Sequence, residues 1–175
     1  MIETTQSVVI DAPIDTVWAY AKDVERWAEI MPGYQQCEIA DEDNSRWVLK
    51  VGVGGLVRTV KVQVHVDEWA GPESVIFSFK LEGDPVSGSG SYLALPQGSV
   101  ATGVTLNVRV EGGGPMAPMW EAMGGPLLPK FALAFAEQLK GRIETSLGIP
   151  AAPRAPSLFA RIGLLLRNLF GRLFG

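Results

Sequence analysis

Apolar and polar residues alternate along most of the chain between residues 35 and 111, which predicts a series of β-strands. The clearest example is residues 59–67, where four valines alternate with polar side chains. A period of two residues places the valines on one face of a strand and the polar residues on the other. Short polar or glycine-containing segments separate the strands, and one more strand is predicted at residues 7–11. The pattern therefore indicates about seven strands in an antiparallel meander.

The period changes to that of a helix from Pro126 to Leu147. Apolar residues recur there at steps of three and four, so they share one side of the helix: Leu128, Phe131, Phe135, Leu139, Ile143 and Leu147. Gly148 and Pro150 are typical of a helix end. Two shorter helices, divided near Lys22-Asp23, are expected between the first strand and the rest of the sheet. They would connect the first strand to the second.

Only the long helix is large enough to cover one apolar face of the sheet. We therefore expect an α+β fold in which a curved antiparallel sheet of about seven strands wraps around the long C-terminal helix. A curved sheet and a straight helix diverge in places, so we also expect an apolar cavity between them. The predicted ligand-binding residues are Trp27, Met31, Phe77, Phe79, Tyr92, Leu106, Met116, Met119, Trp120, Met123, Leu127, Leu128, Phe131 and Phe135.

The segment 112–125, between the last strand and the long helix, allows two interpretations. It contains three of the five methionines, a tryptophan and two glycine clusters. Methionine adapts to varied apolar shapes and glycine permits hinge motion, which favours a gate for an apolar ligand. An ordinary connector, whose apolar side chains close one end of the core, explains the same residues.

Composition supports one globular domain over residues 1–147, because 47% of the 175 residues are hydrophobic and 19% are charged. All 19 acidic residues precede residue 150, whereas the last 25 residues contain arginines and no acid. An acidic body argues against nucleic-acid binding. The single cysteine, Cys37, allows no internal disulfide, and we interpret it as a small buried side chain beside Ile39. The start of the chain lacks the pattern of a signal peptide, so we expect a cytoplasmic protein.

The C-terminal segment has a different composition from the rest of the chain. Residues 148–156 form a predicted proline-rich linker, and residues 157–175 a predicted amphipathic helix with a basic polar side. We expect this helix to lie in a membrane interface without spanning the bilayer, although docking onto a partner protein or onto its own domain remains open. The predicted membrane-binding residues are Leu158, Phe159, Arg161, Ile162, Leu165, Leu166, Arg167, Leu169, Phe170, Arg172, Leu173 and Phe174.

The sequence offers little that would support catalysis or metal binding. His65, the only histidine, falls on the polar face of its strand, and no phosphate-binding loop, metal-ligand cluster or activated nucleophile is recognisable. We therefore expect no catalytic residue, no metal and no cofactor. The remaining enzyme hypothesis is that Tyr92 or Glu121 acts as an acid or base on a bound polyketide-like ring.

Several short motifs carry a resemblance to a known superfamily. They are the opening strand, Ala12-Pro13, Val17-Trp18, Asp23, Met31-Pro32-Gly33, and the final helix with Phe131 and Phe135. Over residues 2–147 the chain resembles the START-like (SRPBCC) superfamily, which has the helix-grip fold. Within that superfamily it is most similar to the accessory-subunit family of carbon monoxide dehydrogenase.

The resemblance implies a binding protein with an internal apolar cavity. In that interpretation, the protein carries an isoprenoid quinone such as menaquinone between the membrane and a molybdenum-containing carbon monoxide dehydrogenase. It would be peripheral on the inner face of the cell membrane and would help the enzyme to associate with that membrane. The alternatives are a polyketide cyclase or aromatase-like enzyme, and an assembly or anchoring factor with no ligand.

Overall fold

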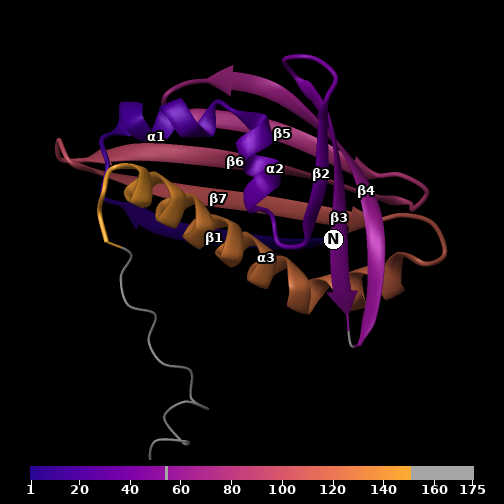
Figure 1. Ribbon diagram of the computed structural model, residues 1–175. Coiled ribbons are helices and arrows are strands. Elements are labelled where there is room, and N and C mark those ends of the chain that lie inside the picture. The colour runs from indigo at the N-terminus through magenta and orange to yellow at the C-terminus, as the bar shows by residue number, and fades with distance from the viewer. Residues whose placement is uncertain (54, 151–175) are drawn as a thin grey trace, which may run out of the picture.

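A computed structural model describes residues 1–53 and 55–150 of the chain (Figure 1). The elements in chain order are β1 (Ile2–Ile10), α1 (Ile14–Ala21), α2 (Val24–Ile30), β2 (Tyr34–Ile39), β3 (Asn44–Val53), β4 (Leu56–Ala70), β5 (Ser74–Leu81), β6 (Val86–Gln97), β7 (Ala101–Gly112) and α3 (Ala117–Ser146). The order of elements matches the prediction from the sequence, including the two short helices between β1 and β2.

The seven strands form one antiparallel sheet in the order β1-β7-β6-β5-β4-β3-β2. Strands β2 to β7 follow one another as a meander, and β1 pairs with β7 along its whole length, from Ile2 opposite Val110 to Ile10 opposite Thr102. The sheet is curved but not closed, because β1 and β2 are its two edges. Figure 1 shows α3 lying along one side of the sheet, with α1 and α2 near its C-terminal end. The predicted fold, a curved sheet wrapped around a long C-terminal helix, is confirmed.

Two local features set the path of the chain from α1 to β3. The Asp23 side chain caps α2, since its Oδ1 accepts hydrogen bonds from the N–H groups of Glu25, at 3.2 Å, and Arg26, at 3.4 Å. Gly33 has a φ of 80°, and a Cβ at this position would collide with the carbonyl oxygen of Lys50. The Gly33 carbonyl instead accepts the Lys50 N–H at 2.7 Å. This close approach brings the end of α2 against β3.

Helix α3 begins earlier than the sequence pattern predicts. It starts at Ala117 rather than Pro126, so both Pro126 and Pro129 lie inside it. Each proline lacks an N–H and removes one hydrogen bond of the helix, which is why the pattern predicted a start there. Packing compensates for this loss: Gly124 lies close to the Ile2 side chain of β1, and a Cβ at Gly124 would come within 2.8 Å of it. The glycines of this segment therefore allow the helix to approach the sheet.

The C-terminal half of α3 is attached to β1 by a pair of charged residues. The Lys140 ammonium donates to the Val9 carbonyl at 2.7 Å and to the Glu144 carboxylate, which also accepts the Asp11 N–H at 2.9 Å. Burial alone would raise the pKa of Glu144, but these hydrogen bonds and the Lys140 charge outweigh it and lower that pKa. The helix ends as predicted, with Gly148 at a φ of 73° after the last turn.

The placement of Cys37 differs in part from the prediction. Cys37 is half-buried and packs against the core, but Ile39 is exposed rather than buried beside it. The reason is that β2 is an edge strand, so its last residues extend beyond the helices that cover the rest of the sheet. Burial raises the pKa of the Cys37 thiol to about 11, which keeps it protonated at neutral pH. His65 is exposed on the outer face, as predicted, and its Nδ1 lies 2.8 Å from Asn44 Oδ1.

Candidate ligand-binding cavity

A cavity of about 740 Å³ lies between the inner face of the sheet and helix α3. Side chains from β3 to β7 form one wall, and side chains of α3 between Trp120 and Leu139 form the other. Ile2 of β1, Ala21 of α1 and the α2 region complete it. The wall is apolar except for three residues, Arg58, Tyr92 and Glu121. A space of this size and chemistry is within the range of proteins that bind small apolar molecules.

Two glycines of β6 help to create this space. Gly88 lies opposite Phe79 and Gly90 opposite Phe77 in the pairing of β5 with β6. A Cβ at either glycine would collide with the ring of the opposite phenylalanine. The two rings therefore lie over the backbone of β6 and stay close to the sheet. We infer that larger residues at these positions would push the rings toward the cavity.

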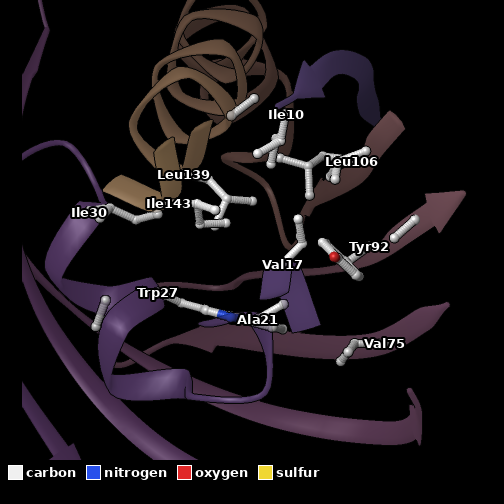
Figure 2. Packing of buried hydrophobic residues seen from close by; sticks show 14 of the residues in the cluster. Ile10, Val17, Ala21, Trp27, Ile30, Val75, Tyr92, Leu106, Leu139 and Ile143 are labelled. Atoms are coloured by element: carbon white, nitrogen blue, oxygen red, sulfur yellow. The ribbon is translucent and has the colours of Figure 1, made fainter. Parts of the chain in front are cut away.

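The inner end of the cavity, which we define as Ala21, Trp27, Tyr92, Leu106 and Leu139, is closed by well-packed residues. Each of these side chains is almost completely buried. Figure 2 shows that residues from α1, α2, β6, β7 and α3 gather around this end. The Trp27 ring also contacts Phe77, with ring centroids 5.8 Å apart in an edge-on arrangement. These contacts make the inner end part of the hydrophobic core.

Tyr92 introduces one polar group at the inner end. Its side chain is 2% exposed, and its hydroxyl oxygen is the only buried side-chain nitrogen or oxygen without a hydrogen-bond partner among residues 1–53 and 55–150. Burial raises the pKa of Tyr92 well above its ordinary value, so the hydroxyl remains protonated at physiological pH. The cavity therefore contains a neutral hydroxyl whose hydrogen-bonding capacity is unused.

The opposite end of the cavity, which we call the mouth, is defined by Ile2, Val57, Arg58, Gly112, Trp120 and Glu121. Val57 is 69% exposed although it lines the cavity. The Arg58 guanidinium lies over the Trp120 ring, 5.6 Å from its centroid, and binds Asp84 Oδ2 at 2.6 Å. The Glu121 carboxylate accepts a hydrogen bond from the Met1 amine. Charged groups at this end thus have partners, in contrast to Tyr92 at the other end.

All of the predicted ligand-binding residues except Met116 and Met119 line the cavity. Met116 and Met119 are 49% and 40% exposed and lie on the outer side of the first turn of α3. The predicted connector at 112–125 is correspondingly short, because residues 117–125 belong to α3, yet Trp120 and Met123 do reach the cavity wall. Whether this segment acts as a gate stays a prediction, as does the role of each residue in binding.

Two groups of cavity residues were not predicted from the sequence. The first is the set of apolar residues of β3, β4 and β7 that share the inner face with the predicted aromatic residues: Trp47, Leu49, Val51, Val60, Val62, Val64, Val108 and Val110. Their alternation already placed them on the apolar face, so the signal was present. The second is Arg58, Gly88 and Gly90. The alternate glycines in residues 88–90, two positions apart like the phenylalanines of β5, were a detectable signal, whereas nothing in the sequence pointed to Arg58.

The cavity does not bring catalytic groups together. Tyr92 lies six residues along β6 from Val86 at the mouth end, which corresponds to about 20 Å. Glu121 is part of the mouth, so it is too far away to act on the same ligand atom as Tyr92. Within the part of the chain that the structure describes, no group of three or more His, Cys, Asp or Glu residues is arranged to hold a metal ion.

The predicted membrane-binding helix at 157–175 and most of the linker 148–156 lie outside the described residues. Among residues 1–53 and 55–150, no helix is both long enough and apolar enough to cross a membrane.

Comparisons with known proteins agree with this geometry. A family model described as polyketide cyclase/dehydrase and lipid transport matches residues 1–149. A conserved protein from Geobacillus kaustophilus has 20% sequence identity and a TM-score of 0.72, covering 83% of this chain and 97% of its own. A START superfamily protein from Mycobacterium smegmatis has 18% identity and a TM-score of 0.64, covering 82% of this chain and 98% of its own.

An aromatase/cyclase from a Streptomyces species also shares the fold, with 20% identity and a TM-score of 0.60, covering 83% of this chain and 94% of its own. No curated protein matches the sequence significantly. At these identities the solved structures establish the fold alone. They support the START-like part of the predicted resemblance, whereas membership of the carbon monoxide dehydrogenase accessory-subunit family stays a prediction.

Proposed function

The chain belongs to the polyketide cyclase/dehydrase and lipid transport family, and from this premise we propose that it binds one long apolar molecule in the cavity beneath α3 and carries it. Membership of this family and the START-like fold support a hydrophobic ligand. The observation that carries the proposal is the cavity itself, which is about 740 Å³ in volume and is apolar over nearly all of its wall.

The energetics favour a molecule with an extended apolar part. Transfer of each CH₂ group from water into an apolar site is favourable by about 0.8 kcal/mol. A chain of about ten such groups gains roughly 8 kcal/mol before the costs of association are subtracted. This gain is large enough for stable binding of a water-insoluble molecule, and it needs no specific polar contacts. It therefore suits a carrier that releases its ligand unchanged.

Within this class, we propose an isoprenoid quinone such as menaquinone as the ligand and a molybdenum-containing carbon monoxide dehydrogenase as the recipient. The support for this finer assignment is the sequence resemblance to the accessory-subunit family of that enzyme. A quinone combines an isoprenoid tail with a small ring that carries carbonyl groups, so both parts are compatible with the cavity wall. The protein would then act as a carrier with no chemistry of its own.

We also propose that the protein works at a membrane surface. The support is the pattern of residues 157–175, in which apolar residues occupy one side of a predicted helix and arginines the other. In addition, Val57, Met116 and Met119 expose apolar side chains on elements at the mouth end. A mouth that faces the bilayer would let an apolar ligand move between membrane and cavity without crossing water.

The alternative is a cyclase-like enzyme in which Tyr92 or Glu121 acts as an acid or base. The family description includes cyclases, and both residues line the cavity. Against this alternative, the Tyr92 hydroxyl is a weak acid whose pKa is raised further by burial, and Glu121 lies at the other end of the cavity. Conversion of an added polyketide by the purified protein would favour the enzyme over the carrier.

Solvent extraction tests the carrier proposal. The full-length protein is purified without detergent and extracted with organic solvent, and the extracted molecules are identified by mass spectrometry. We expect an isoprenoid quinone in amounts close to that of the protein. Val108→Trp, which places a large ring in the cavity, should lower the recovered amount at least 10-fold. Glu111→Trp lies on the opposite face of the same strand and serves as the matched control.

The outcomes separate the parts of the proposal. Recovery of a different apolar lipid, lost in Val108→Trp and retained in Glu111→Trp, would keep the carrier and reject the quinone. Equal recovery from both variants would show that the lipid is bound elsewhere, and would reject the cavity as the binding site.

Liposome flotation tests the membrane proposal separately. Deletion of residues 151–175 should release the protein from anionic liposomes while leaving ligand affinity in detergent nearly unchanged. Substitution of Leu165 and Leu169 by aspartate should have the same effect without removing a positive charge. If the truncated protein floats as well as the intact one, the segment is not the anchor, and docking onto a partner protein becomes the better explanation.

A further inference from the structure

The hydroxyl of Tyr92 is the feature of the cavity that apolar binding leaves unexplained. A phenylalanine would fill the same volume, and the adjacent wall residues are all apolar. A buried hydroxyl without a partner lowers stability, because it has lost its hydrogen bonds to water and gained none in the protein. Among the described residues it is the only buried side-chain polar atom in this state. The free energy of unfolding would therefore increase if a bound molecule supplied the missing partner.

We propose that the Tyr92 hydroxyl donates a hydrogen bond to an oxygen atom of the ligand, which holds the ligand with its oxygen-bearing end inward. This inference rests on the proposed function, because it assumes that the cavity is the binding site. It specifies the ligand class more narrowly: an apolar molecule with a neutral hydrogen-bond acceptor, such as a carbonyl, at one end. The apolar remainder then extends along the cavity toward Trp120 and Arg58 at the mouth.

The charges around the cavity support this orientation. A carboxylate or phosphate at the inner end would lack a cationic partner, because the basic group of the wall, Arg58, is at the mouth and already binds Asp84 at 2.6 Å. Burial of an ionised group without a partner costs far more than one hydrogen bond returns. A neutral acceptor carries no such penalty. The inner end therefore selects for a neutral oxygen and against a charged head group.

A matched pair of probes tests the assignment. Acetylnaphthalene and ethylnaphthalene have nearly the same shape, but only the first has a carbonyl oxygen. The affinity of each for the full-length, delipidated protein is measured by displacement of the neutral fluorophore phenylnaphthylamine. The measured quantity is the ratio of the two affinities, because the ratio removes differences in how well the cavity accepts the ring.

We expect Tyr92→Phe to lower this ratio by about 5- to 10-fold, and to do so by weakening acetylnaphthalene while leaving ethylnaphthalene unchanged. Tyr34→Phe is the control, since Tyr34 is absent from the cavity wall and its loss should not alter the ratio. The carbonyl stretching frequency of bound acetylnaphthalene provides a second measurement. It should be lower in the wild type than in Tyr92→Phe, as expected for a carbonyl that accepts a hydrogen bond.

The control for folding is the melting temperature of the ligand-free protein. Tyr92→Phe removes a hydroxyl without a partner, so it should leave the melting temperature unchanged or raise it. An unchanged affinity ratio, or a carbonyl frequency that is the same in both proteins, would overturn the Tyr92 assignment while leaving the cavity proposal intact. Failure of both probes to displace the fluorophore would overturn the cavity proposal and, with it, the assignment.

Discussion

The two ends of the cavity are built in different ways. At the inner end, helices α1, α2 and α3 meet the sheet, and Trp27, Leu106 and Leu139 are almost fully buried. At the mouth, Val57 and Arg58 are exposed, and a hydrogen-bonded Arg58 lies over Trp120. The polar groups are distributed in the same asymmetric way: those at the mouth have partners, whereas Tyr92 has none. The difference indicates that the inner end stabilises the fold and recognises the ligand, while the mouth controls access.

Substitution of leucines at the two ends tests this comparison with the largest expected effect. Leu139→Ala removes a side chain that is 1% exposed, so it should lower the free energy of unfolding by about 2–4 kcal/mol. Leu128→Ala removes a half-buried side chain of the same helix that already borders the cavity, and should cost about 1 kcal/mol or less. Urea denaturation measures both values. Equal losses would mean that the two ends contribute equally to stability.

The attachment of α3 to β1 should show a dependence on pH. Glu144→Gln weakens the hydrogen bonds with Lys140 and Asp11, so we expect a loss of about 1–2 kcal/mol at neutral pH. Because the pKa of Glu144 is lowered in the folded protein, its contribution is present above the unfolded pKa, about 4.3, and is lost as pH falls through the folded pKa. The stability difference between wild type and variant should therefore shrink in acid. A difference that grows at low pH would contradict this assignment.

At the mouth, we expect changes in rate rather than in stability. Arg58→Ala removes the contact with Trp120 and the ion pair with Asp84, which together are worth roughly 1 kcal/mol. Release of phenylnaphthylamine should become about 3- to 10-fold faster, with a change in affinity of less than about 3-fold, because capture becomes faster as well. Stopped-flow fluorescence measures the rates. Arg109→Ala, which breaks the exposed pair with Glu3 away from the cavity, is the control and should leave them unchanged.

The smallest effect is expected for the ion pair between Glu121 and the Met1 amine. Both groups are well exposed, and exposed pairs of this kind contribute little. Glu121→Gln should therefore change the free energy of unfolding by less than about 0.5 kcal/mol. A loss above about 1 kcal/mol in urea denaturation would show that the mouth contributes to the stability of the fold, contrary to the comparison between the two ends.

The sequence predicted the sheet well because each strand has one buried face. In β4, the alternation of Val60, Val62, Val64 and polar residues reports burial directly, so period and environment agree. The start of α3 was predicted wrongly because two prolines and two glycines usually interrupt a helix. Here contact with Ile2 of β1 overrides that local preference, and such a contact is invisible without the fold.

The candidate site was predictable to the same extent. Aromatic and apolar residues on the inner face were identified because they share the period of the core, so Phe77, Phe79 and Phe131 all line the cavity. Their period does not distinguish a cavity from a filled core, and the glycines opposite the phenylalanines had to be seen in register. The lone hydroxyl of Tyr92 could be named as a polar residue, but its lack of a partner is a property of the packed structure alone.

Native mass spectrometry of the full-length protein, purified without detergent, tests the central claim most directly. The account predicts that the intact chain carries the mass of one apolar molecule, that Val108→Trp abolishes this added mass, and that Glu111→Trp retains it. A wild-type protein that shows only the mass of its own chain after purification from cells rich in apolar lipids, and that gains none when lipid is added, would contradict the claim that the cavity is a ligand-binding site.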